Sequence, residues 1–358
     1  MKLIHCSDLH LDSSMETNLP NKKAAQRKRE IERTFERMVR AAKENDVSVI
    51  LIAGDLFDTA AVTAMTVDFV LDTVRQCPTI DFLYLRGNHD KNPLSLSART
   101  LPDNLKLFGD TWTTYSYPDA DITGIEWTDD NAASMYDSLA LDPGRTNIVV
   151  MHGMTGTVPG RETVCLPKLR QKGIDYLALG HLHSYQKEFI DGRGSYCYSG
   201  CLEGRGFDEC GEKGYVLLET TDGGIRSTFT PFAQRTLEEI RVDVTGLEKF
   251  TQIRAAAAEA LSTCPQESLV KLVLTGKTTL TAQLDVGFLE NCFTGDFYFI
   301  KVKDETVLAA DPADFAGDIS LKGVFIRSVL NDQTLTEEER KAIITAGLQA
   351  LAGEEIAL

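Results

Sequence analysis

Short apolar runs alternate with helical patterns over the first 230 residues of the chain. Apolar Ile31, Phe35, Met38 and Val39 recur at helical spacing, which predicts an amphipathic helix over residues 22–40. Seven runs predict strands, at residues 2–7, 47–53, 81–85, 147–151, 176–179, 195–198 and 215–219. Strands that alternate with helices are typical of an α/β fold.

The pattern changes near residues 231–236. Beyond them we expect a strand at 239–244, a helix at 247–261, a strand at 269–274, a further helical piece and a strand at 297–303. Residues 309–334, rich in Asp, Gly and Ala, are interpreted as a linker. Thr336 and Glu339 form a capping-box pattern that opens a last helix running to about Leu351. The domains expected are therefore 1–235, a small α+β domain at 236–330, and a C-terminal helix within 331–358.

Length and charge narrow the classes of protein. The 358 residues, 43% of them hydrophobic, suit two domains with sizeable cores. A net charge of −16 argues against a protein that coats nucleic acid through its phosphates. Residues 22–40 run against this trend, with eight basic and three acidic side chains. They form either a solvated helix face or a patch that steers phosphate, and Arg27, Lys28 and Arg33 are the candidate contacts.

The chain has no run of about 18 apolar residues and no basic, apolar leader, so we expect a cytoplasmic protein with no membrane partner. Its eight cysteines are scattered, and none belongs to a C-x-x-C pair. This spacing predicts reduced thiols and argues against zinc or thiol redox chemistry.

Polar clusters follow five of the predicted strands. Five of the six histidines lie in these clusters, and Asp8, Asp55 and Asn88 accompany them. In α/β sheets, ligands gather beyond the carboxyl ends of strands. A lone histidine is usually structural, but this joint placement predicts a metal site.

The residue types of the predicted ligands indicate how many metal ions they hold and which metals they favour. Two divalent cations about 3.5–4 Å apart need a bridging carboxylate, neutral imidazoles and oxygen donors. Asp55 follows a glycine that permits a sharp turn and is the best candidate for the bridge. Asp8 and His10, and likewise His181 and His183, stand two apart, so each pair projects to one side of an extended segment. Imidazole and carboxylate without thiolate favour manganese or iron over a structural zinc site.

These clusters, taken in order, carry a family resemblance. The set Asp8-x-His10, Gly54-Asp55-x-x-Asp58, Gly87-Asn88-His89-Asp90, His152-Gly153 and Gly180-His181-x-His183 resembles the calcineurin-like metallophosphoesterases. The sequence around the first, second and fifth motifs is similar to SbcD-type DNA repair nucleases. Two further motifs resemble their bacterial YhaO branch, Tyr198-Ser199-Gly200-Cys201-Leu202-Glu203-Gly204-Arg205 and Gly211-Glu212-Lys213-Gly214. The resemblance implies an α/β four-layer sandwich of two mixed sheets flanked by helices, a small α+β capping domain and a C-terminal helix.

The resemblance also implies roles for individual residues. One metal would be held by Asp8, His10, Asp55 and His183, and the other by Asp55, Asn88, His152 and His181. His89 would be the catalytic histidine, oriented by Asp58. Asp90 is left open between structural capping and support of the site. Tyr198-Ser199-Gly200 stands where the family commonly has Tyr-Pro-Gly, which bears on substrate preference and not on the ligands.

The activity implied is that of a DNA exonuclease, with endonuclease activity left open. Two divalent metal ions are implied, Mn²⁺ first, with Fe²⁺ or Mg²⁺ as alternatives. The resemblance further implies an SbcC-like ATPase partner at the C-terminal helix and a homodimer. The alternatives are a stand-alone phosphodiesterase or phosphatase on small phosphoesters or phosphoproteins, and a non-catalytic scaffold. The scaffold is disfavoured because all seven ligand positions are filled.

Overall fold

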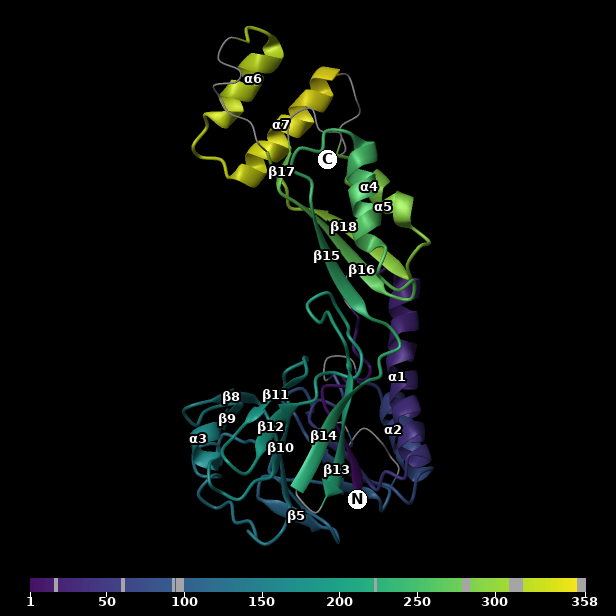
Figure 1. The fold of residues 1–358 in the computed structure, drawn as a ribbon, viewed down its shortest axis with the longest axis vertical. Coiled ribbons are helices and arrows are strands. Elements are labelled where there is room, and N and C mark those ends of the chain that lie inside the picture. The colour runs from purple at the N-terminus through teal and green to yellow at the C-terminus, as the bar shows by residue number, and fades with distance from the viewer. Residues whose placement is uncertain are drawn as a thin grey trace. The chain divides into compact units, whose positions relative to one another are not determined.

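The computed structural model describes residues 1–15, 19–58, 62–91, 94, 100–221, 224–278, 284–308 and 318–352. The chain divides into two compact units, Met1–Thr236 and Leu237–Leu358, each with its own sheets (Figure 1). No helix in the described ranges is both long enough and apolar enough to cross a bilayer.

Two six-stranded mixed sheets make up the centre of the first unit. In order across the first sheet lie β14 (Gly224–Pro231), β13 (Gly214–Thr221), β1 (Lys2–Cys6), β2 (Val49–Ala53), β3 (Asp81–Leu85) and β4 (Leu105–Leu107). In order across the second lie β11 (Gln186–Phe189), β12 (Ser195–Tyr198), β10 (Tyr176–Gly180), β7 (Asn147–His152), β6 (Asp121–Gly124) and β5 (Thr113–Ser116). Strands β1, β2 and β3 of the first sheet are parallel, as are β7, β10 and β12 of the second, which places the carboxyl ends of each set along one edge. Strand β13 runs antiparallel to β1.

A hydrophobic layer fills the space between the two sheets. Leu51 and Leu83 from the first sheet pack with Val150 and Ala178 from the second, and all four are fully buried. Every residue of β2 is buried, as expected for a strand covered on both faces. This explains why the inner strands read as continuous apolar runs in the sequence.

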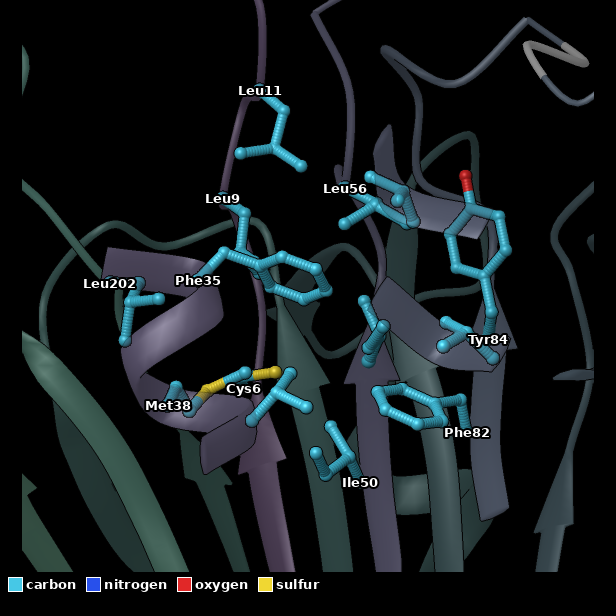
Figure 2. Packing of buried hydrophobic residues seen from close by; sticks show 14 of the residues in the cluster. Cys6, Leu9, Leu11, Phe35, Met38, Ile50, Leu56, Phe82, Tyr84 and Leu202 are labelled. Atoms are coloured by element: carbon cyan, nitrogen blue, oxygen red, sulfur yellow. The ribbon is translucent and has the colours of Figure 1, made fainter. Parts of the chain in front are cut away.

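Helices cover the outer face of the first sheet. Helix α1 (Asn21–Glu44) turns Phe35 and Met38 toward Cys6 of β1 and Ile50 of β2, as Figure 2 shows. Helix α2 (Ala64–Arg75) is capped by Thr63, whose side chain accepts a hydrogen bond from the Thr66 backbone, and it packs in the same cluster.

The outer face of the second sheet has a further cluster, which includes residues of the short helix α3 (Leu166–Leu169). Near it a small parallel pair forms from β8 (Met154–Gly156) and β9 (Thr163–Cys165). The expected architecture of mixed sheets flanked by helices is confirmed.

The second unit is built on a three-stranded parallel sheet of β15 (Leu237–Asp243), β16 (Leu269–Thr275) and β18 (Phe299–Asp304). Helices α4 (Phe250–Leu261) and α5 (Val286–Phe293) supply Ile253 and Leu289 to its core. A second, two-stranded parallel sheet joins β17 (Lys277–Thr278) and β19 (Val307–Leu308).

Two helices follow in the second unit. Helix α6 (Leu321–Leu330) lies inside the stretch that we interpreted as a linker, so that interpretation is wrong for residues 321–330; residues 309–317 lie outside the described ranges. Helix α7 (Glu337–Ala352) packs on α6 through Ile344 and Ile326. Its capping box is present, because the Thr336 backbone N–H donates to Glu339 Oε2 at 2.8 Å and the Glu339 N–H donates to Thr336 Oγ1 at 3.2 Å.

Candidate metal centre

The predicted ligands lie at the carboxyl ends of five neighbouring strands. Asp8 and His10 follow β1, Asp55 follows β2, and Asn88 follows β3, all in the first sheet. His152 ends β7, and His181 and His183 follow β10 in the second sheet. The site therefore forms where the corresponding edges of the two sheets meet.

The segments after β1 and β2 are tied together by main-chain hydrogen bonds. The backbone N–H groups of Asp8 and His10 donate to the carbonyls of Gly54 and Asp55, both at 3.0 Å. Asp8, His10 and Asp55 have φ values of 52°, 45° and 51°, a left-handed region that costs free energy for residues other than glycine. The shared hydrogen bonds hold these conformations, and the side chains converge as a result.

One group of ligands consists of Asp8, His10 and His183, whose donor atoms all lie within 4.8 Å of one another. His10 Nε2 and His183 Nε2 are 3.2 Å apart, and His183 Nε2 is 3.9 Å from Asp8 Oδ1. Asp8 and His10 are fully buried, and His183 is partly buried. Two imidazole nitrogens and a carboxylate at this spacing suit a divalent cation.

A second group joins Asp8 and Asp55 to His152 within the same 4.8 Å limit. His152 Nε2 lies 3.4 Å from Asp55 Oδ2 and 2.9 Å from Asn88 Oδ1, and His181 Nδ1 lies 3.3 Å from that same amide oxygen. Asp55 Oδ2 is also 3.8 Å from His10 Nε2. Asp55 therefore faces a histidine of each group, and Asp8 belongs to both groups. Both carboxylates lie where a bridging carboxylate belongs, and Asp55 remains the predicted bridge.

Glycines let the main chain approach these ligands closely. A Cβ on Gly54, which has φ of +94°, would lie 2.1 Å from His152 Nδ1. A Cβ on Gly180 would lie 1.9 Å from the Ala53 carbonyl oxygen. The same Ala53 carbonyl is 2.9 Å from His152 Nδ1, so an Nδ1–H donor would leave Nε2 directed at Asp55 and Asn88.

Burial and neighbouring charges shift the pKa values of the buried ligands. Burial raises the pKa of Asp8 to about 6 and lowers that of His10 to about 2. Burial would also lower the pKa of His152, but its hydrogen bond and ion pair with Asp55 outweigh this and raise it to about 9. Two buried carboxylates, Asp8 and Asp55, lie among these imidazoles with donor atoms within 4.8 Å, and divalent cations would balance their charge. The donor set therefore fits two metal ions.

His89 and Asp58 lie beside this cluster. His89 is directly after Asn88, its side chain is 45% exposed, and its backbone N–H donates to Asp55 Oδ1 at 2.9 Å. His89 Nδ1 is 3.9 Å from Asp58 Oδ1, an ion-pair distance that is too long for a hydrogen bond. The ring of His89 also meets that of His10 edge-on, with centroids 4.9 Å apart.

Asp90 has a structural part in the site. Its carboxylate accepts hydrogen bonds from the backbone N–H groups of Leu56, Phe57 and Gly87, at 3.3, 3.0 and 3.0 Å. These bonds join the segment after β2 to the segment after β3. Of the two roles left open for Asp90, the contacts favour the structural one.

Comparison with known proteins agrees with this arrangement. The family model for calcineurin-like phosphoesterases matches residues 1–185, just over half of the chain. The chain belongs to this family. Its members hydrolyse phosphoester bonds at a site with two metal ions, so the protein is a phosphoester hydrolase.

Individual relatives are more distant. The chain is 28% identical over 295 residues to the uncharacterized metallophosphoesterase YhaO of Bacillus subtilis strain 168, a match that covers 77% of this chain and 72% of that one. Two solved structures, TT1561 of Thermus thermophilus and a dimetal phosphatase from Danio rerio, match 64% of this chain and 98% and 99% of theirs, at 12% and 10% identity with TM-scores of 0.40 and 0.42. A novel archaeal phosphodiesterase matches 64% of this chain and all of its own, at 14% identity and a TM-score of 0.33.

One of the three residues expected to contact phosphate from the basic helix α1 of the phosphoesterase, Arg27, does not face solvent. Arg27 is fully buried, and its guanidinium donates to Glu30, Glu203 and the Gly204 carbonyl. The expectation that Arg27 contacts substrate is wrong for this reason. Lys28 forms an ion pair with Asp12, and Arg33 is exposed; as DNA contacts these two remain predictions.

Sequence reasoning missed three polar residues that support the ligands of the phosphoesterase. Ser7 donates from Oγ to Asp8 Oδ2 at 2.5 Å. Glu209 Oε1 lies 2.6 Å from His183 Nδ1, and Arg205 forms an ion pair with Glu209 at 2.9 Å. Arg205 belongs to a motif that resembles the YhaO branch, but nothing in the local sequence indicates that its loop packs against His183 after β10.

Proposed function

We propose that this phosphoesterase cleaves phosphodiester bonds in DNA with Mn²⁺ as its metal, acting on ends as an exonuclease. The observation that carries the proposal is the exposure of His89 and Asn88 beside four buried ligands, Asp8, His10, Asp55 and His152. A phosphodiester within a polymer can reach exposed groups without entering a closed pocket. The exposed His89 ring can meet such a phosphate from solvent.

Each metal would have four ligands, with Asp55 shared between them. Asp8, His10, Asp55 and His183 would hold one metal, and Asp55, Asn88, His152 and His181 the other. When bound, the two cations would lower the pKa of water and neutralise charge on the phosphate. His89 would bind the scissile phosphate or donate a proton to the leaving oxygen. Imidazole, carboxylate and amide donors without a thiolate support Mn²⁺ over Zn²⁺.

We also propose a partner for helix α7. Ile344 on this helix is fully buried against α6, which accounts for part of its apolar surface. Ile343, next to it, is 38% exposed and would contact an SbcC-like ATPase. Ile343→Glu should abolish co-purification with such an ATPase and leave metal-dependent hydrolysis unchanged.

A second candidate is hydrolysis of small phosphodiesters or phosphomonoesters. The net charge of −16 and the burial of Arg27 favour it, because both weaken the attraction of a long polyanion. The experiment must therefore compare the two substrate classes directly.

The test is digestion of end-labelled DNA with Mn²⁺, run beside bis-p-nitrophenyl phosphate. His89→Ala is compared with wild type and with Lys168→Ala, an exposed position on α3. Cleavage of DNA that is lost in His89→Ala, with metal content unchanged, is the expected result. Ester hydrolysis with intact DNA would favour the second candidate. Loss of metal in His89→Ala would contradict the role given to His89.

A further inference from the structure

The segment from Cys201 to Lys213 holds the main chain of His183. The His183 carbonyl accepts hydrogen bonds from the Cys201 backbone N–H at 3.3 Å and from Lys213 Nζ at 2.7 Å. Lys213 is only 3% exposed, so its ammonium is committed to the interior. Two donors on one carbonyl fix the backbone of this ligand after it leaves β10.

The same segment also holds the imidazole ring. Glu209 Oε1 lies 2.6 Å from His183 Nδ1, and Glu209 is 4% exposed. An ionised carboxylate can only accept a hydrogen bond, so Nδ1 must be the protonated nitrogen. In the neutral ring that binds a metal, Nε2 then keeps its lone pair, and it faces His10 Nε2 and Asp8 Oδ1 at 3.2 and 3.9 Å.

Arg205 holds Glu209 in turn. Its backbone N–H donates to Glu209 Oε2 at 2.7 Å, and its Nε and Nη2 donate to Oε1 at 3.2 and 2.9 Å. Nη1 of Arg205 also lies 3.5 Å from Asp58 Oδ2, and Asp58 faces His89. One guanidinium thus stands between the carboxylate behind a metal ligand and the carboxylate beside His89.

The loop that bears Arg205 is anchored to helix α1. Glu203 Oε1 accepts from Thr34 Oγ1 at 2.7 Å, and Glu203 Oε2 accepts from Arg27 Nη2 at 3.0 Å. The Gly204 carbonyl accepts from the same Arg27 nitrogen at 2.9 Å. These buried bonds fix the start of the loop one residue before Arg205.

We propose that Glu209 and Arg205 are positioning residues of the metal centre. Glu209 selects the Nδ1–H tautomer of His183 and so presents Nε2 to the metal that Asp8 and His10 also bind. Arg205 holds the Glu209 carboxylate in place, and it aligns Asp58 behind His89. The inference rests on the proposed metal centre and is independent of DNA as the substrate.

The first test is metal binding to Glu209→Gln, measured by calorimetry with Mn²⁺ and without substrate. Loss of a carboxylate behind a metal-bound histidine typically lowers metal affinity about 10–100-fold, and we expect this at one of the two sites. Glu209→Asp should recover part of the affinity. Asp175→Asn is the matched control, because it removes a carboxylate from the Arg193 ion pair at the amino end of β10. Equal affinities in Glu209→Gln and Asp175→Asn would overturn the proposal.

Arg205 is tested separately. Arg205→Lys keeps the positive charge but cannot form the forked contact with Glu209. We expect a smaller loss of affinity at the same site. Unchanged Mn²⁺ affinity in Arg205→Lys would overturn the assignment of Arg205.

An NMR measurement on the wild-type protein tests the tautomer of His183 without a variant that must first fold. In the protein labelled with ¹⁵N-histidine and loaded with diamagnetic Zn²⁺, NMR should show an exchange-protected proton on Nδ1 of His183. Coordination of the metal by Nδ1, with the proton on Nε2, would overturn the proposal. Neither measurement involves nucleic acid, so failure of the DNA proposal would leave their outcome intact.

Discussion

Arg27 and Arg33 lie six residues apart on helix α1, and the structure gives them opposite surroundings. Arg27 is fully buried with its guanidinium bonded to Glu30, Glu203 and the Gly204 carbonyl, whereas Arg33 is exposed. The two substitutions Arg27→Met and Arg33→Met remove the same charge from the same helix. They separate a structural role from a surface role.

The cost of Arg27→Met can be worked out from the partners that remain. Glu30 keeps Arg235, which donates to it at 2.8 and 2.9 Å, so this carboxylate stays paired. Glu203 loses the cation on its Oε2 and keeps only the donors on Oε1. Removing one partner of a buried ion pair costs about 3–5 kcal/mol, and the surviving pair places this case near about 3 kcal/mol.

Urea denaturation and thermal melting provide the assay. For a unit of this size, a loss of about 3 kcal/mol corresponds to a fall of about 6–12 °C in Tm. Arg33→Met should change the free energy of unfolding by no more than about 0.5 kcal/mol. If Arg33 contacts DNA, Arg33→Met should instead weaken binding and reduce its salt dependence. Equal unfolding midpoints for the two variants would refute the structural reasoning about Arg27.

Three further predictions concern pH, packing and metal. Burial lowers the pKa of His5 to about 3. Between about pH 6.5 and 3 the unfolded chain therefore binds a proton that the folded chain does not. As the pH drops through this range, the free energy of unfolding falls by about 1.4 kcal/mol per pH unit. Denaturation at pH 7, 6 and 5 should show a shallower dependence in His5→Gln, and parallel profiles would contradict this. Gly180→Ala places a Cβ 1.9 Å from the Ala53 carbonyl oxygen, so it should lower the free energy of unfolding by about 1–3 kcal/mol and reduce the amount of bound metal. Thermal melting and elemental analysis measure the two effects, and a normal metal content would contradict the prediction. Removal of the metal ions with a chelator should abolish hydrolysis and lower the Tm, because each metal at 100 times its Kd adds about 2.7 kcal/mol of stability. An unchanged Tm after addition of the chelator would argue against metal binding to the folded state.

The sequence was most informative where strands are buried on both faces. β2 and β10 are apolar throughout and were predicted nearly to their ends. The edge strands β5 and β11 were missed, because they are largely exposed and carry mixed polar residues. Helix α6 was missed because it is only 10 residues long and contains Gly323 near its start. Its stability comes from packing on α7, which local sequence does not reveal.

The candidate ligands were predictable because each follows a recognisable strand. The residues behind them were not. Glu209 is 26 residues from His183 in the chain, and Arg27 is 176 residues from Glu203. Such pairs form only when the sheets are assembled, so their partners depend on tertiary structure. A basic helix with a buried arginine looks the same in sequence as one with a fully exposed basic face.

The position of β1 has a consequence for how the protein is made. β1 lies between β2 and β13, so it gains one of its two neighbours only when residues 214–221 have been translated. Until then its backbone N–H and C=O groups along that side have no strand partner. All seven ligands are already translated, but β1, which leads into Asp8 and His10, is held on one side only. Folding that depends on such distant pairing is slow, and partly made chains expose apolar strands that can aggregate. We therefore expect a chain stopped just before β13 to be captured by chaperones and to bind no metal stably.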